Sequence, residues 1–182
     1  MLTYADKQLI ARDSTLPGLT ALLDPTVLLE ELQQIPRLKS AVEIQVKYLR
    51  YKPANSCACT LQIKLADGTT QYYFAKALTA ERFNQSWNHP KRQALVQAQN
   101  PHAPLALFEQ CILLQHPAYE HGIRHLTWLV DNDARRHLLS LCNLSPNEQE
   151  KAEIDILRYK PERRLVAKVK LNDRPVALIR CT

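Results

Sequence analysis

A five-residue segment occurs twice in this chain of 182 residues. Leu-Arg-Tyr-Lys-Pro begins at Leu49 and again at Leu157, 108 positions later. In both places an alternating run of apolar and polar residues precedes the segment, and a turn that contains its proline follows. Because such alternation is typical of a strand with one buried face, the repeat predicts two copies of one β unit.

Each copy continues with two more strand-like runs. The second runs cover 57–65 and 165–171, and the third runs cover 71–78 and 175–181. Asp67-Gly68 and Asn172-Asp173 separate these runs and are residue pairs typical of tight hairpin turns. The pattern therefore predicts two three-stranded antiparallel meanders, each with one buried face.

Alternation breaks in the first copy where Tyr48 and Leu49 adjoin, which predicts a β-bulge or a strand end there. Outside the repeat, apolar spacing and capping residues favour helices over 26–35, 91–99 and 134–142, and a helix beginning at 79–83. Asp133 is the expected N-cap of the third of these helices. Two short apolar runs, 111–115 and 125–130, are expected to be strands. The chain as a whole is thus expected to be an α+β protein with helices packed on one side of its meanders.

The polar, proline-containing stretch 143–149 is the expected linker between two parts. Residues 1–142 would then form an N-terminal cap-like α+β subdomain, and residues 150–182 the second meander. The net charge of +6 follows the same repeat. Residues 41–78 carry five basic and two acidic side chains, and residues 148–182 carry nine and six. The basic surplus therefore accompanies the two β units.

Composition excludes several classes of protein. Three glycines are too few for a Gly-rich nucleotide-binding loop of the Rossmann or Walker type. The five cysteines form no C-x-x-C pair, and the histidines lack metal-ligand spacing, so we expect buried free thiols and no metal site. No signal peptide or membrane-spanning run of about 18 apolar residues is present, and we expect a cytoplasmic protein without membrane association.

The second copy, ILRYKPERRLVAKVKLNDRPVALIR, resembles the N-terminal lobe of aminoglycoside phosphotransferase-type kinases. The resemblance covers residues 41–181 and implies that the second meander is an incomplete kinase-like N-lobe. In that family a lysine on the third strand contacts the ATP phosphates as a point charge. Lys76 stands at the matching place in the first copy, and Arg180 replaces the lysine in the second. Arg163 and Arg164, in the turn after the pentapeptide, are further candidates for phosphate contacts.

The catalytic loop of that family has an H-x-D motif, which occurs nowhere in this chain. No residue is therefore assigned a catalytic role. The resemblance implies the N-terminal, non-catalytic portion of an ATP-dependent small-molecule phosphotransferase, inactive alone and with no cofactor of its own. A complete protein would use ATP and Mg²⁺, with a kinase-like C-lobe present in cis or in trans.

A second interpretation is a non-catalytic interaction or regulatory module. The last strand, 174–181, would then present an unpaired edge to a partner strand or to a second copy of the chain. The basic charge also raises nucleic-acid binding as a hypothesis. The strands next to Tyr72, Tyr73 and Phe74 offer Cys, Leu, Ile and Gln instead of further aromatic and basic residues, which disfavours it.

Overall fold

The computed structural model describes residues 2–182, which form two compact units. The first unit ends at His116 and the second begins at Pro117. This division lies upstream of the polar stretch 143–149 that was expected as the linker. Part of that stretch belongs to the short helix α7 (Pro146–Lys151), which Ser145 and Glu148 cap reciprocally. A helix with its own capping box accounts for the polar composition that suggested a linker.

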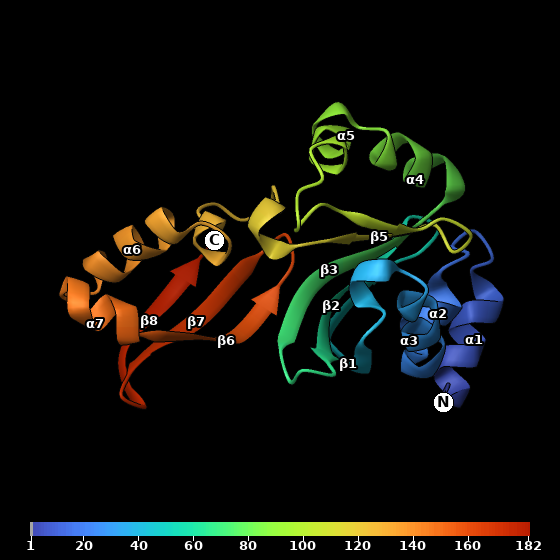
Figure 1. Ribbon diagram of the computed structural model, residues 1–182. Helices are drawn as coiled ribbons and strands as arrows, with labels where there is room; N and C mark the ends of the chain where they lie inside the picture. The colour runs from blue at the N-terminus through green and yellow to red at the C-terminus, as the bar shows by residue number, and fades with distance from the viewer. Residues whose placement is uncertain (1) are drawn as a thin grey trace. The chain divides into compact units, whose positions relative to one another are not determined.

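The first unit contains a five-stranded antiparallel sheet (Figure 1) with the order β1-β2-β3-β5-β4. Its strands are β1 (Ala41–Lys52), β2 (Ser56–Leu65), β3 (Thr70–Leu78), β4 (Leu105–Leu107) and β5 (Ile112–Gln115). Its helices are α1 (Tyr4–Arg12), α2 (Leu19–Leu23), α3 (Pro25–Gln33), the 3₁₀ turn η1 (Pro36–Leu38), α4 (Ala80–Trp87) and α5 (Pro90–Gln97). The expected helices near 26–35 and 91–99, the helix start at 79 and the strand at 111–115 are confirmed to within a few residues.

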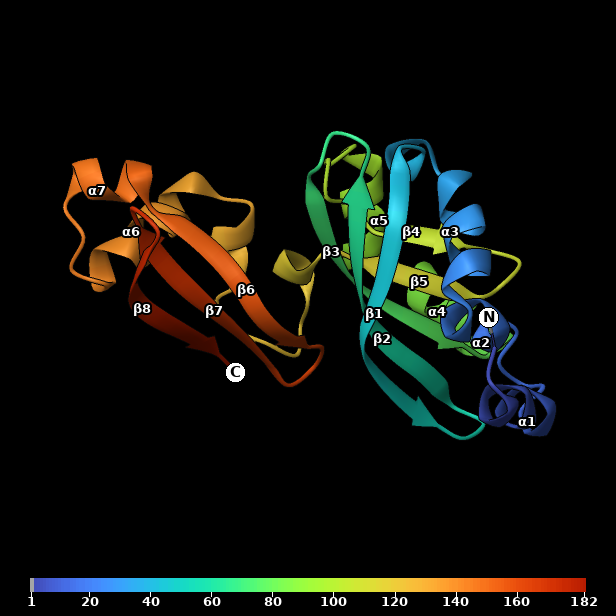
Figure 2. The same cartoon turned by 90° about the horizontal axis from the view of Figure 1, so that it is seen from below.

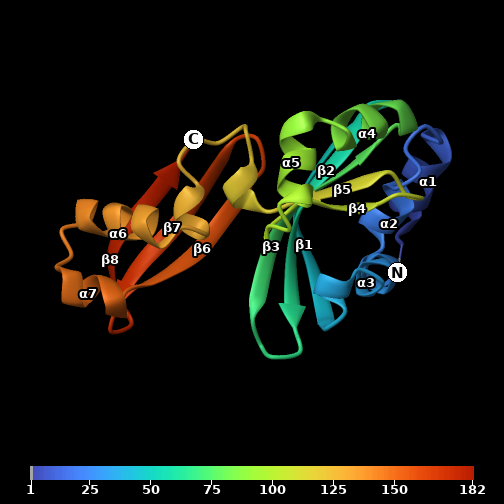
Figure 3. The ribbon, with the colours of Figure 1, turned by 45° about the horizontal axis from the view of Figure 1, so that its top comes forward.

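Helices cover both faces of this sheet, so the expectation of helices on one side is wrong for the first unit. Alternate residues of β5 show the division: Ile112 and Leu114 join the core formed with α2 and α3, whereas Leu113 packs with Phe83 of α4. Figure 3 shows α4 and α5 on the side of the sheet opposite α3. Because both faces are covered, β2 is buried along most of its length, although its sequence alternates between apolar and polar residues.

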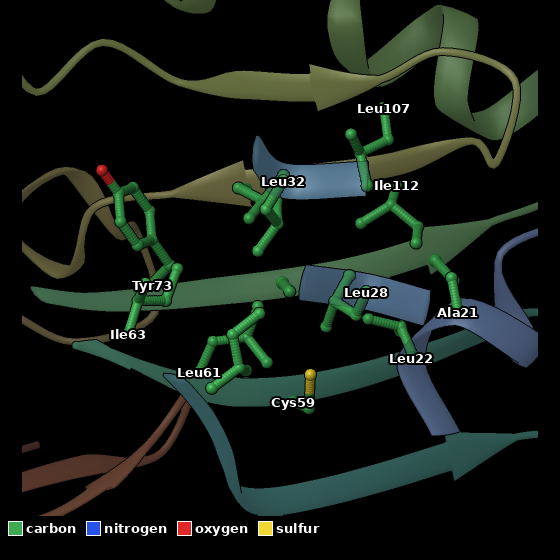
Figure 4. Close-up of a cluster of buried hydrophobic side chains, with 14 of the residues drawn as sticks. Ala21, Leu22, Leu28, Leu32, Cys59, Leu61, Ile63, Tyr73, Leu107 and Ile112 are labelled. Atoms are coloured by element: carbon green, nitrogen blue, oxygen red, sulfur yellow. The ribbon is translucent and has the colours of Figure 1, made fainter. Parts of the chain in front are cut away.

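The larger core lies between the sheet and the N-terminal helices. Leu22 and Leu28 from α2 and α3 lie against Cys59 and Leu61 of β2 (Figure 4), and all four side chains are fully buried. Asp24 begins α3 by accepting the N–H of Thr26 at 3.1 Å, with Pro25 in the first turn. This cap fixes where the apolar spacing of α3 starts and therefore which leucines reach the sheet.

The second unit contains a three-stranded antiparallel sheet of β6 (Glu153–Lys160), β7 (Arg164–Leu171) and β8 (Arg174–Cys181). Figure 2 shows β7 between the other two strands. Preceding elements are η2 (Pro117–Tyr119), η3 (Thr127–Leu129), α6 (Asn132–Leu141) and α7. The expected strand at 125–130 is wrong, because the segment contains the 3₁₀ turn η3, in which Trp128 is buried. The helix near 134–142 is confirmed, but its N-cap is Asp131 and not Asp133: Asp131 accepts the N–H of Ala134.

The repeated pentapeptides adopt matching backbone conformations. Both end a first strand, and the proline of each begins a three-residue turn whose second residue has a positive φ: 50° at Ala54 and 60° at Glu162. The residue after each closes the turn with a backbone hydrogen bond of 3.1 Å to Lys52 or Lys160. Each first strand also has a register shift, between Val46 and Tyr48 in the first copy and between Ile156 and Arg158 in the second, which is two residues later relative to the pentapeptide. The first shift locates a bulge close to its predicted position. The internal repeat of the sequence is therefore a repeat of structure.

Candidate functional site

The outer face of the second sheet and the turn beside it carry three of the four residues expected to contact phosphate. Leu165, Ala167 and Val169 of β7 are fully buried, so the intervening residues of that strand point to the other face. Cross-strand pairing then places residues of β6 and β8 beside these residues of β7, in rows that cross the sheet. We call this surface the basic face; its members are Arg158, Lys160, Arg164, Val166, Lys168, Lys170, Leu178 and Arg180.

One row of the basic face brings two arginines to the same level. Val166 pairs with Arg158 on β6 and with Arg180 on β8. The next row toward the turn pairs Lys160 with Arg164, and Arg163 lies in the turn itself. Directly opposed residues have Cβ atoms about 5 Å apart, as in the Lys160–Arg164 pair, whereas Arg158 and Arg180 lie on either side of Val166, two strand spacings (~10 Å) from each other. Five cations therefore lie at one end of the sheet.

The other end of the basic face is neutralised by carboxylates. Lys170 Nζ lies 2.7 Å from Asp155 Oδ2 and 3.6 Å from a Glu153 carboxylate oxygen, and Lys168 Nζ lies 3.9 Å from Asp155. At the turn end, within residues 2–182, no carboxylate is within ion-pair distance of the four arginines. Positive charge therefore accumulates at the end of the face next to the β6–β7 turn.

This crowding has electrostatic consequences. Desolvation and the neighbouring charges of Arg158, Arg164 and Arg163, in that order, lower the pKa of Lys160. Arg164 also has a buried Nε that lacks a hydrogen-bond acceptor within the described chain. A group of like charges in this arrangement attracts anions, and guanidinium groups suit phosphate oxygens in particular.

Apolar side chains lie beside the cations. Leu178 is 68% exposed and lies on the same face of β8 as Arg180, two residues before it. It pairs with Lys168, in the row next to the one that contains Arg158, Val166 and Arg180. Val166 lies in the middle of the row and is partly exposed. The basic face thus combines an apolar strip with a cationic end.

Of the four candidates from the sequence, Arg164 and Arg180 belong to the basic face, and Arg163 lies in the turn at its end. Lys76 belongs to the first unit, on β3, between Ala58 of β2 and Leu113 of β5. Its Nζ lies 5.7 Å from the centre of the Phe74 ring. Sequence reasoning did not find the strip of Val166 and Leu178, although the period-2 pattern of β7 places Val166 on the same face as Arg164.

Other chemistry is limited. Burial raises the pKa of the Cys57 thiol to about 11 and that of Cys59 further, so both thiols stay protonated at neutral pH. Over residues 2–182, no cluster of three metal-ligating side chains occurs. None of the helices in that range is both long and apolar enough to span a bilayer.

Comparison with known protein families, curated proteins and solved structures finds no match for the chain.

Proposed function

We propose that the chain is the N-terminal, non-catalytic portion of an ATP-dependent small-molecule phosphotransferase, and that its basic face binds the phosphates of the nucleotide. The observation that carries the proposal is the convergence of Arg158, Lys160, Arg163, Arg164 and Arg180 at one end of a sheet. Desolvation, and after it the repulsion from the neighbouring arginines, lowers the pKa of Lys160, and a polyphosphate chain would offset that repulsion.

The apolar strip supports a nucleotide as the ligand in place of a free polyphosphate. A nucleotide needs an apolar surface for its base next to cations for its phosphates. Val166 and Leu178 supply such a surface within the width of one strand from Arg158 and Arg180.

Phosphoryl transfer itself needs groups that the chain does not provide. Its sequence has no H-x-D motif to supply a catalytic base. In the proposed arrangement a kinase-like C-lobe, in cis or in trans, contributes the base and the Mg²⁺ ligands. The chain alone then binds ATP without turnover.

Isothermal titration calorimetry with ATP, with and without Mg²⁺, tests the proposal on the full chain. We expect Arg164→Gln and Arg180→Gln each to weaken ATP affinity about 5- to 10-fold, as expected for loss of one charge-assisted hydrogen bond. Lys151→Gln removes the same charge from the exposed end of α7 and should leave the affinity within about 2-fold. Absence of ATP binding by the unmodified chain, or equal weakening by Lys151→Gln, would overturn the proposal.

A second function is favoured by a separate observation, the exposed edge of β8. This strand pairs only with β7 within the described chain, and Val176 is 44% exposed beside the still more exposed Leu178. An edge strand with apolar side chains can receive a partner strand, including that of a second copy, by β-addition. Sedimentation velocity over a concentration series tests the homodimer: Leu178→Lys should abolish association, and a strictly monomeric unmodified chain would refute it.

A further inference from the structure

Arg92 of α5 is a half-buried cation with only neutral hydrogen-bond acceptors in the described chain. Its Nη1 donates to the backbone O of Ser86 and, at 2.9 Å, to Ser86 Oγ. Its Nη2 donates to Gln115 Oε1 at 3.2 Å. Burial lowers the pKa of this guanidinium. A desolvated charge without a counter-ion costs free energy, and a bound anion would offset that cost.

The acceptor Gln115 connects Arg92 to a second cation. Gln115 of β5 pairs directly with Phe74 of β3, and Lys76 lies two residues further along β3 on the same face. The Lys76 Nζ lies over the Phe74 ring, 5.7 Å from its centre. Arg92 reaches the same pair from α5, so the two positive groups approach one place on the sheet from different elements.

Three paired strands form the part of the sheet next to Lys76 and Arg92. Phe74 lies between Thr60 on β2 and Gln115 on β5, and both Thr60 and Phe74 are buried. Further along the same face of the sheet, Leu78 and Leu113 pack with Phe83 of α4. Lys76 of β3 and Arg92 of α5 thus project from regular secondary structure, which suits a site for a small ligand.

We propose that Lys76 and Arg92 together bind a small tetrahedral oxyanion, a phosphate ion or the phosphate group of a monoester, over the Phe74–Gln115 pair. Two cations that approach from different directions match the charge and the separate oxygen atoms of a phosphate dianion better than the single plane of a carboxylate. All of these residues belong to the first unit, so the site shares no residue with the basic face and does not depend on the proposed function.

Nuclear magnetic resonance titration of the ¹⁵N-labelled full chain tests the site, with inorganic phosphate and phenyl phosphate as probes at constant ionic strength. We expect saturable shifts of the backbone amides at 74–76 and 113–115. Lys76→Gln and Arg92→Gln should each raise the dissociation constant at least about 10-fold, since each removes one charged partner. Arg92→Lys keeps the charge and should lose less affinity.

Arg82→Gln is the matched control, because Arg82 is an exposed arginine of the neighbouring helix α4. It should leave the titration unchanged. Amide spectra of each variant without phosphate establish that the fold is intact, and Arg92→Lys covers the case in which Arg92→Gln unfolds.

The outcomes separate the two sites. Binding of both probes assigns the site to any phosphate group, and binding of phenyl phosphate alone assigns it to organic phosphates; each supports the inference. Shifts confined to residues 158–166 would overturn it and leave the proposed function standing. Failure of ATP to bind the basic face, with the shifts at 74–76 retained, would overturn the proposed function and leave the inference about Lys76 and Arg92 standing. Equal binding by Arg92→Gln, Arg92→Lys and the unmodified chain would also overturn it.

Discussion

The phenol oxygen of Tyr51 lies 2.7 Å from Oδ2 of Asp13 and donates a hydrogen bond to it. The same carboxylate oxygen accepts the backbone N–H of Ala54 at 2.9 Å. In the second unit, Glu120 likewise accepts from the Tyr159 hydroxyl and from the N–H of Glu162. Each copy of the pentapeptide is therefore bound by a carboxylate that precedes its tyrosine by 38 or 39 residues. The carboxylate holds both the strand end and the left-handed residue of the turn.

Removal of the Tyr159 hydroxyl should destabilise the second unit. Burial, followed by the charge and hydrogen bond of Glu120, raises the pKa of Tyr159, so the phenol remains a donor over the accessible pH range. Tyr159→Phe leaves a buried carboxylate with one donor fewer, and we expect a loss of about 1–3 kcal/mol in the free energy of unfolding. Urea denaturation measures it.

Tyr51→Phe should lower the urea midpoint by a smaller amount, because Thr15 also donates to Asp13 through its hydroxyl at 2.5 Å. Tyr4→Phe is the control, since Tyr4 is 79% exposed. A Tyr159→Phe midpoint equal to that of Tyr4→Phe would show that the buried hydrogen bond contributes no stability.

Gly122→Ala should disturb the same carboxylate. A Cβ at position 122 would lie 2.7 Å from Cα of Glu162 and 3.2 Å from Oε1 of Glu120. Because the nearer atom belongs to the backbone, the β6–β7 turn must shift, and we expect a loss of about 1–3 kcal/mol. Gly68→Ala is the comparison: its Cβ meets open space, and only its φ of 86° opposes the change. An equal or smaller effect of Gly122→Ala in urea denaturation would contradict the steric argument.

Ala54→Gly should stabilise the first unit. Ala54 has a φ of 50°, a left-handed conformation that costs a residue with a Cβ roughly 1–2 kcal/mol. Glycine avoids this cost but loses about 0.5–1 kcal/mol through its greater freedom when unfolded. The expected net gain is up to about 1 kcal/mol, measured as a rise in melting temperature. Ala11→Gly within α1 should instead lower it, and a similar decrease for Ala54→Gly would show that the turn is not strained.

Stability of the first unit should fall as the pH decreases below about 6.5. Burial and the neighbouring His102 lower the pKa of His116 from 6.5 to about 4. Between these values the unfolded chain binds a proton that the folded chain does not, so stability is complete above pH 6.5 and is lost progressively toward pH 4. The slope approaches about 1.4 kcal/mol per pH unit for one such group.

Urea denaturation at pH 7.5 and pH 5, followed by Trp87 fluorescence in a Trp128→Phe background, measures this dependence. His116→Gln should reduce the difference between the two pH values, whereas His137→Gln, at an exposed position of α6, should not. If both variants retain the full pH dependence, other groups are responsible for it.

The β repeat could be predicted from the sequence because its signals are local: alternation, a proline turn and a hairpin pair each act within a few residues. The helices that cover the two faces of the first sheet could not be predicted in this way. Period-2 patterning shows which residues share a face, but the burial of Leu113 beneath α4 and of Ile112 beneath α2 depends on contacts between distant segments. The 3₁₀ turn at Thr127–Leu129 has too few residues for apolar spacing to distinguish it from a strand.

The candidate sites follow the same division. Arg163 and Arg164 could be selected because they closely follow the proline of the turn, but the alignment of Arg158 with Arg180 required the register of two strand pairs. Arg92 could not be found at all, because nothing in the spacing of α5 indicates that its guanidinium reaches Gln115 of β5.

The distance in sequence between each tyrosine and its carboxylate has a kinetic consequence. The β1–β2 and β6–β7 hairpins are local and can form on a microsecond timescale. The Asp13–Tyr51 and Glu120–Tyr159 contacts close much longer loops and must wait for the preceding segment to dock. Tyrosine absorbance should therefore report the last step of assembly in each half of the polypeptide, after amide protection has already appeared in the hairpins.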